Sequence, residues 1–161
     1  MRSKRHTEQM RVVLITGVSS GIGLALIRQL WKSKYRIVAT AREGSLPKLV
    51  GEHFRDTDRF LLRPLDVTEH HERERLIREI NQRWGGVDIL INNAAISFRS
   101  VMEHMSQEDD LIQMSTNYLS AMALTRLVLP TMRKNRWGRI INVSSVGGMM
   151  AMPTMGAYSA S

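Results

Sequence analysis

The chain of 161 residues is long enough to bury one hydrophobic core and too short for two ordinary domains. Its composition, 43% hydrophobic and 24% charged without any cysteine, is that of a globular protein and excludes a disulfide framework or a thiolate metal site. The formal net charge of +8 suits an anionic ligand, nucleic acid or solubility alone, but no basic stripe is interleaved with aromatic residues, so we expect no nucleic-acid partner.

The first eleven residues form a basic tail before the first apolar run. This tail lacks the apolar segment and small-residue cleavage site of a signal peptide. No apolar run in the chain approaches the roughly 18 to 20 residues of a membrane span. We therefore expect a cytoplasmic protein with no membrane partner, in which residues 12–161 form the folded domain.

Short apolar runs alternate with longer stretches that have helical periodicity. The strict alternation predicts parallel βαβ units, and because the runs are continuously apolar, helices should cover both faces of the sheet. The predicted fold class is therefore α/β, a doubly wound parallel sheet. The five predicted strands are residues 12–16, 36–40, 60–65, 88–92 and 139–143, and the helical stretches are residues 22–31, 75–84 and 111–132.

The segment TGVSSGIG, residues 16–23, joins the first strand to the first helix. Glycines in such a turn let the backbone approach a pyrophosphate, and the helix N-terminus offers free N–H groups and the positive end of its dipole. The spacing differs from the commoner G-x-G-x-x-G, and a glycine-rich turn without function is the alternative. The residues predicted to bind a cofactor here are Gly17, Ser19, Ser20, Gly21, Ile22 and Gly23.

The second strand ends in ATAREG, where an acidic residue would hold a ribose 2′-hydroxyl and an arginine a 2′-phosphate. Ala41 occupies the expected acidic position and Arg42 follows it. This pattern favours NADP(H) over NAD(H). The alternative is that Arg42 is a solvated surface residue beside a helix start.

Two more strand ends point to the same crevice, LDVT after the third strand and NNAA after the fourth. Asp66 could accept a hydrogen bond from an adenine amino group, or it could instead cap a helix. Asn93 with its small neighbours would let a ribose lie close, whereas Asn92 could simply brace the loop. The predicted cofactor contacts here are Asp66, Val67, Asn93, Ala94 and Ala95.

The successive segments TGVSSGIG, LDVT, NNAA, STN, RIINVSSVGG and YSAS resemble the motifs of the short-chain dehydrogenase/reductase family from Val12 to Ser161. The separation between Ser145 and Tyr158 is also typical of that family. The resemblance implies a Rossmann-like fold in which Tyr158 is the general acid/base and also contacts the cofactor. It further implies that Ser145 hydrogen-bonds the substrate oxygen and that Asn117 positions a helix and a water.

In the family pattern Y-x-x-x-K, a lysine follows the tyrosine by four residues, and here it would fall one position beyond Ser161. The resemblance also implies seven parallel strands, of which this sequence supplies five. We therefore expect a C-terminally incomplete domain, a fragment of a longer product. In this piece, residues 139–143 should form an exposed apolar edge.

The sequence thus predicts an NADP(H)-dependent oxidoreductase that interconverts a carbonyl and a secondary alcohol, and a homo-oligomer when full length. The alternatives are a non-catalytic dinucleotide-binding or interaction module and an inactive fragment. The methionines of GGMMAMPTM could line an apolar substrate pocket or only pack a loop. No metal is expected, because His70 and His71 are adjacent on a helix start and point apart.

Overall fold

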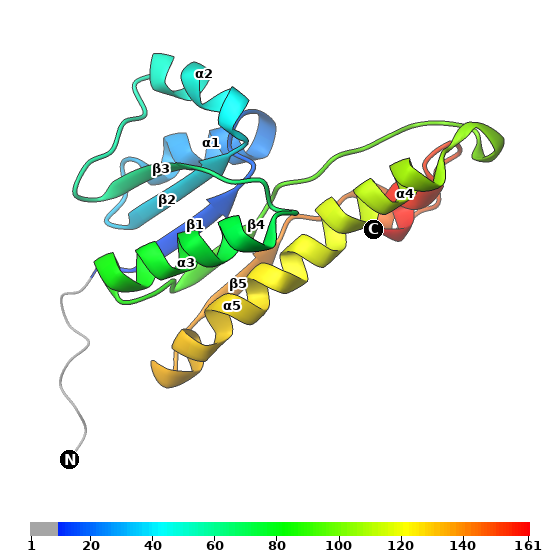
Figure 1. Cartoon of the computed structure of the whole chain (residues 1–161). Coiled ribbons are helices and arrows are strands. Elements are labelled where there is room, and N and C mark those ends of the chain that lie inside the picture. Colours follow the sequence, from blue (N-terminus) through cyan, green and yellow to red (C-terminus); the bar gives the residue numbers. More distant parts are fainter. Residues whose placement is uncertain (1–9) are drawn as a thin grey trace.

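The central strand β1 (Val12–Thr16) is buried along its whole length in the computed structural model, which describes residues 10–161. It pairs in parallel with β2 (Arg36–Ala41) on one side and with β4 (Ile89–Asn92) on the other. The strands β3 (Phe60–Pro64) and β5 (Arg139–Asn142) form the two edges, so the strand order is β3-β2-β1-β4-β5. The predicted doubly wound α/β sheet is confirmed (Figure 1).

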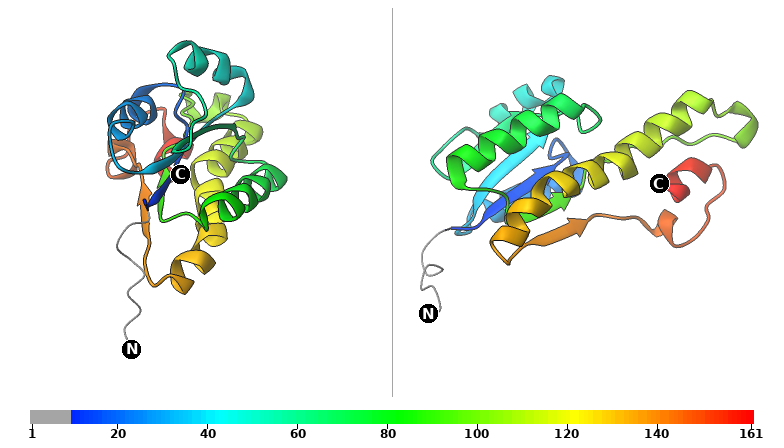
Figure 2. Two further views of the ribbon diagram at one scale, coloured as in Figure 1. Left: turned by 90° about the vertical axis from the view of Figure 1, so that its left-hand side faces the viewer. Right: turned by 60° about the horizontal axis from the view of Figure 1, so that its bottom comes forward.

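Helices cover both faces of the central strands, as continuous apolar strands require. Val12 and Leu14 of β1 pack in one core cluster with residues of α3 and α5, whereas Val13 and Ile15 pack in a second cluster with residues of α1 and α2. Two views of the chain show these helix layers on either side of the sheet (Figure 2). Each fully buried aliphatic side chain stabilises this arrangement by about 1.5–3 kcal/mol.

Most helix positions match the sequence prediction, with differences at the ends. The helix predicted from residue 75 begins five residues earlier because its first turn is polar and shows no apolar periodicity, and it ends where Gly85 adopts a left-handed φ of 83°. A short helix after β2 was not predicted. The α-helices are α1 (Gly21–Leu30), α2 (Leu46–Gly51), α3 (His70–Trp84), α4 (Gln107–Met114), α5 (Ser120–Lys134) and α6 (Gly156–Ala160).

The prediction of one α-helix over residues 111–132 is wrong in its middle. A π-helical segment, η3 (Ser115–Leu119), separates α4 from α5. Apolar periodicity does not reveal such an insertion, because one wider turn rotates the side chains without interrupting the helix. π-Turns inside helices are frequent at functional sites. Three short 3₁₀ segments complete the structure: η1 (Glu43–Ser45), η2 (Met102–His104) and η4 (Val146–Gly148).

The edge strand β5 is exposed, unlike the three inner strands. Ile140 and Ile141 retain 37% and 48% of their accessible surface, so the predicted apolar edge is present. Over the residues that the structure describes, no helix has both the length and the apolar character needed to cross a membrane.

Candidate active site

The carboxyl ends of all five strands open into one crevice of about 1240 Å³. It lies where the chain turns to one side of the sheet after β1 and to the other after β4, which is the usual ligand position in open α/β sheets. Every predicted site residue except Gly21 and Gly23 lines this crevice. These lining residues are Gly17, Ser19, Ser20, Ile22, Arg42, Asp66, Val67, Asn93, Ala94, Ala95, Asn117, Ser145 and Tyr158.

The glycine turn between β1 and α1 is packed too tightly for side chains. Gly17 has a φ of 71°, and a Cβ on it would lie 2.7 Å from the Cα of Ala94. A Cβ on Gly23 would collide with the carbonyl oxygen of Gly17 and lie 2.6 Å from the side-chain nitrogen of Asn93. Gly21 also has a positive φ, 53°, although nothing lies near its missing Cβ. A side chain is therefore disfavoured at each of the three glycines, for a different geometric reason in each case.

The N-terminus of α1 presents N–H groups that its own cap does not use. Ser20 is the N-cap but its side chain accepts no hydrogen bond, and the first amide bonded to its carbonyl is that of Leu24. N–H groups in a first helical turn together with the dipole favour a phosphate or pyrophosphate. This uncapped terminus and the bare glycine turn fit the pyrophosphate of a dinucleotide.

Two side chains, those of Asn93 and Thr16, connect the glycine turn to the end of β4 by hydrogen bonds. Asn93 donates from its Nδ2 to the carbonyls of Thr16 and Gly17, both at 2.9 Å. The hydroxyl of Thr16 accepts from the backbone N–H groups of Asn93 and Ala94, both at 3.0 Å. Thr16 was not predicted, although a threonine at the end of a buried strand is the signal that could have found it. The turn is therefore held by the end of β4.

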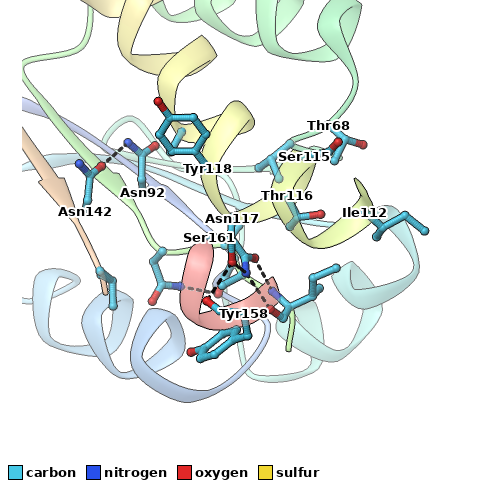
Figure 3. A pocket seen from close by; sticks show the side chains of 18 of the residues that line it. Thr68, Asn92, Ile112, Ser115, Thr116, Asn117, Tyr118, Asn142, Tyr158 and Ser161 are labelled. Carbon is cyan, nitrogen blue, oxygen red and sulfur yellow. Dashed lines mark hydrogen bonds between the residues drawn. The ribbon is translucent and has the colours of Figure 1, made fainter. Parts of the chain in front are cut away.

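Asn92 joins two strands and does not brace the loop, which corrects one of the sequence alternatives. Its Nδ2 donates to Oδ1 of Asn142 at 2.8 Å, linking β4 to β5 at the crevice floor (Figure 3). The loop-bracing amide is the neighbouring Asn93. The two adjacent asparagines point to opposite sides of a strand end, as the two-residue period of a strand requires.

Asp66 forms a local turn and is not the cap of α3, whose N-cap is Glu69. Its Oδ1 accepts from the backbone N–H and the hydroxyl of Thr68, at 2.9 and 2.6 Å. Its own N–H donates to the carboxylate of Glu72, and the buried Arg73 donates to the carbonyl of Val67. Glu72 and Arg73, which were not predicted, hold this loop from α3.

Arg42 follows the end of β2 and is exposed, while Ala41 before it is buried. Both residues line the crevice on the same side as Asp66. Within residues 10–161, the guanidinium of Arg42 has no ion-pair or hydrogen-bond partner. Its donors are therefore free to meet a ligand.

Asn117 lies in the π-helical segment η3 and is fixed by three hydrogen bonds. Its Oδ1 accepts from the N–H of Ile96, and its Nδ2 donates to the carbonyl of Ile96, both at 2.9 Å. Nδ2 also contacts the hydroxyl of Ser161 at 2.8 Å, which brings α6 against the helix (Figure 3). The π-turn thus orients Asn117 toward both the loop after β4 and the segment that carries Tyr158.

Ser145 and Tyr158 both lie against Gly147. The Ser145 hydroxyl accepts from the N–H of Gly147 at 3.2 Å and caps η4. A Cβ on Gly147 would lie 3.1 Å from the ring of Tyr158, so the absence of a side chain lets the ring rest on this turn. Both predicted catalytic side chains are half-buried and reach the same crevice.

Apolar side chains line the crevice, but the methionines of residues 147–155, for which the sequence left pocket lining and loop packing open, are not among them. Met149 is 88% exposed and Met150 is 66% exposed, while Met155 is buried in the loop. None of the four methionines of this loop is among the crevice-lining residues in the described part of the chain. The apolar lining residues include Phe98, Leu111, Ile112 and Met122.

The two adjacent histidines pair with carboxylates at an exposed helix start. His70 lies 3.4 Å from Glu74 and His71 lies 3.6 Å from Glu69. Over residues 10–161 the structure contains no group of three potential metal ligands.

The model of the short chain dehydrogenase family matches residues 11–161. A 3-ketodihydrosphingosine reductase of Bacteroides thetaiotaomicron is 34% identical over 153 residues, which cover 95% of this chain and 54% of that protein. The fold matches a short-chain dehydrogenase from Streptomyces avermitilis with a TM-score of 0.86 and 31% identity, covering 96% of this chain and 56% of the other. It also matches a gluconate 5-dehydrogenase from Burkholderia cenocepacia in complex with NADP and tartrate, with a TM-score of 0.83, 32% identity and coverages of 95% and 60%.

The chain spans about half the length of the curated relatives it matches. The similarity covers almost every residue that the structure describes, including the glycine turn and the segment of Tyr158. The chain therefore belongs to the short-chain dehydrogenase family, whose members are oxidoreductases that bind a nicotinamide dinucleotide.

Proposed function

We propose that the protein is an NADP(H)-dependent oxidoreductase that interconverts a carbonyl and a secondary alcohol. The observation that carries this proposal is that Asn117, Ser145 and Tyr158 line the same crevice as the bare glycine turn. A cofactor bound at that turn and a substrate beside Tyr158 would share this one crevice. The family membership supports the reaction class.

A bound nicotinamide would supply the hydride, which leaves the chain with the proton and the developing charge. Tyr158 would give a proton to the carbonyl oxygen during reduction and take it back during oxidation. The hydroxyl of Ser145 would donate a hydrogen bond to the same oxygen and stabilise its negative charge. Because Ser145 sits in a short capped turn, its position needs no rearrangement.

Asn117 would act by position. Its side chain is held by both backbone groups of Ile96, so its amide cannot rotate without losing two hydrogen bonds. It would fix the loop after β4 against α6 and thereby set the distance between the cofactor and Tyr158. Asn117 would therefore be a positioning residue of the active site.

The preference for NADP(H) rests on Arg42. Its guanidinium is exposed at the end of β2 and has no partner within the described residues, while Ala41 offers no carboxylate for a ribose hydroxyl. A guanidinium binds a phosphate with two parallel hydrogen bonds. The presence of NADP in the similar gluconate 5-dehydrogenase supports this choice.

For the substrate we propose a carbonyl compound with an apolar body. Phe98, Leu111 and Ile112 line the same crevice as Asn117, Ser145 and Tyr158 and are each at least one third exposed. A relative whose name describes the reduction of a keto group, the 3-ketodihydrosphingosine reductase, agrees with the reductive direction.

The proton role is tested with Tyr158→Phe in the natural protein, assayed against a panel of ketones with NADPH. We expect turnover to fall at least about 1,000-fold while NADPH affinity stays within about threefold. Tyr35→Phe, a half-buried tyrosine outside the crevice, is the matched control. Retained turnover in Tyr158→Phe would remove this residue from the mechanism. Cofactor binding without turnover in the unmodified protein would identify a non-catalytic binding module.

The cofactor preference is tested separately by fluorescence titration with NADPH and NADH. Arg42→Ala should lower the affinity for NADPH by about 10- to 100-fold and leave the affinity for NADH nearly unchanged, since only NADPH carries the 2′-phosphate. Arg55→Ala, an exposed arginine that does not line the crevice, should change neither. Equal losses for both cofactors in Arg42→Ala would contradict the assignment.

A further inference from the structure

The edge of the sheet opposite the crevice carries a dense basic surface. All five strands are parallel, so their amino ends meet at this edge. Arg36 and Arg139 are the first residues of β2 and β5, whereas Arg11, Arg59 and Asp88 directly precede β1, β3 and β4. The register aligns Arg36 with Val12, the residue after Arg11, and the backbone N–H of Arg36 donates to the carbonyl of Arg11.

Helix ends enlarge this row into a patch. The carboxyl ends of α1, α3 and α5 reach the same edge, α1 on one face of the sheet and α3 and α5 on the other (Figures 1 and 2). We name this patch the amino-edge surface. Its basic residues are Arg11, Lys32, Lys34, Arg36, Arg59, Arg83, Arg133, Lys134, Arg136 and Arg139.

The amino-edge surface is strongly positive. Its ten basic residues and the two acidic ones, Asp58 and Asp88, give a surplus of eight positive charges. The carboxylate of Asp88 is occupied by the N–H of Val12 at 2.8 Å. None of the ten basic residues forms an ion pair within residues 10–161. Their charge is therefore available to a partner.

Helix stability does not explain this arrangement. Basic residues in the last turn of a helix interact favourably with its dipole, which accounts for Arg83, Arg133 and Lys134. The arginines at the strand starts gain nothing from a dipole, because strands have almost none. Their like charges repel one another, and within residues 10–161 no carboxylate forms an ion pair with them.

Two tryptophans hold the arginines in place. The guanidinium of Arg11 lies 3.3 Å from the ring centre of Trp137, and that of Arg139 lies 5.3 Å from it. Arg36 and Arg83 each lie 5.6 Å from the ring of Trp84. A contact with a ring restrains the guanidinium, and the side-chain N–H groups of Arg11 and Arg83 make no hydrogen bond within residues 10–161, which suits the binding of phosphate groups. Arg139 already donates to the carbonyl of Gly138, and the Nε of Arg36 is buried.

In contrast to the sequence expectation of no membrane partner, we propose that the amino-edge surface docks the protein on a membrane rich in anionic phospholipids. The basic residues spread over both faces and the edge of the sheet, so they match a flat array of phosphates better than a single linear strand. Nucleic acid is less suited, because Trp84 is buried and Trp137 is covered by Arg11, which leaves neither ring as a stacking platform for bases. Docking here needs no spanning helix and leaves the crevice, at the opposite edge, facing the water.

The test is co-sedimentation of the purified protein with vesicles of phosphatidylcholine alone or with about one third phosphatidylglycerol. We expect binding to the anionic vesicles only, and weaker binding as salt increases. The triple variant Lys32→Glu, Lys34→Glu, Arg136→Glu should lose at least about tenfold in vesicle affinity. All three side chains are exposed and none forms an ion pair or a side-chain hydrogen bond within residues 10–161, so the fold should persist, which a circular dichroism melt would verify.

The matched control is Arg55→Glu, Arg75→Glu, Arg126→Glu, which changes the net charge equally at exposed positions outside the amino-edge surface. This control should retain vesicle affinity within about threefold. Equal losses in the two triple variants would show attraction by net charge alone and overturn the proposal. Equal binding to neutral vesicles would overturn it as well, as would tighter binding to duplex DNA or RNA than to anionic vesicles under the same salt.

Discussion

The missing Cβ of Gly17 points at the Cα of Ala94, at 2.7 Å, so the turn after β1 and the loop after β4 touch through bare backbone. We predict that Gly17→Ala destabilises the fold by about 3 kcal/mol or more, because it adds this collision to a left-handed φ of 71°. Gly21→Ala should cost only about 1 kcal/mol, since its φ is also positive but nothing lies near its Cβ. Urea unfolding of both variants measures the difference, and equal losses would contradict the packing argument.

Asn93 provides the second prediction, because its amide is the tie between the glycine turn and β4. Asn93→Ala removes two side-chain donors and leaves the carbonyls of Thr16 and Gly17 without them. We expect a loss of about 1–3 kcal/mol in unfolding free energy and a weaker affinity for NADPH, because the turn would no longer be held open for a pyrophosphate. Asn81→Ala, an exposed helix position, is the control for stability. An unchanged NADPH affinity in Asn93→Ala would show that the turn keeps its shape alone.

Arg63 provides the third prediction, because it links β3 to α3. Its guanidinium lies 2.8 Å from Glu79 and 2.6 Å from Asp56, and these hydrogen bonds, that of Glu79 foremost, raise the pKa of Arg63 above its ordinary value. A raised pKa in a basic group gives stability that is lost only as the pH rises through that pKa. The contribution should therefore be constant from pH 7 to about pH 10.

We expect Arg63→Met to lower the unfolding free energy by about 1 kcal/mol, with the same difference at pH 7 and near pH 10. Arg78→Met removes an exposed pair with Glu74 and should cost less than about 0.5 kcal/mol. Chemical unfolding of both variants at pH 7 and near pH 10 measures these losses in unfolding free energy. A loss in Arg63→Met that vanished near pH 10 would contradict the assignment of the effect to the guanidinium.

The sequence predicted the strands because buried parallel strands are continuous apolar runs, and the predicted range of β1 is identical to the observed one. It could not predict the π-turn at Asn117, because a single wide turn leaves the apolar pattern of the helix intact. It also offered Asn92, and not Asn93, as the amide that could brace the loop. Adjacent residues on a strand face opposite ways, and the sequence does not show which of two equal side chains faces the glycine turn.

Residues that support the site were harder to predict than residues that line it. Thr16, Glu72 and Arg73 act through hydrogen bonds to backbone groups of other loops, and such partners depend on tertiary contacts. For the methionines after Ser145 the sequence left two alternatives open, the lining of a substrate pocket and the packing of a loop. Composition could not decide between them, because the direction of an irregular loop cannot be inferred from side-chain chemistry, and Met149 points into solvent.

The last prediction concerns β5, whose outer edge is unpaired and whose Ile141 is 48% exposed. An apolar parallel edge is a template for pairing with another chain, and a charge on it opposes that pairing. We expect Ile141→Lys to reduce concentration-dependent association in light scattering while changing the unfolding free energy by less than about 1 kcal/mol. Val50→Lys, which adds the same charge at a 41% exposed position on α2, should leave association unchanged. A similar reduction in both variants would assign the effect to net charge and would leave the β5 edge without a role in association.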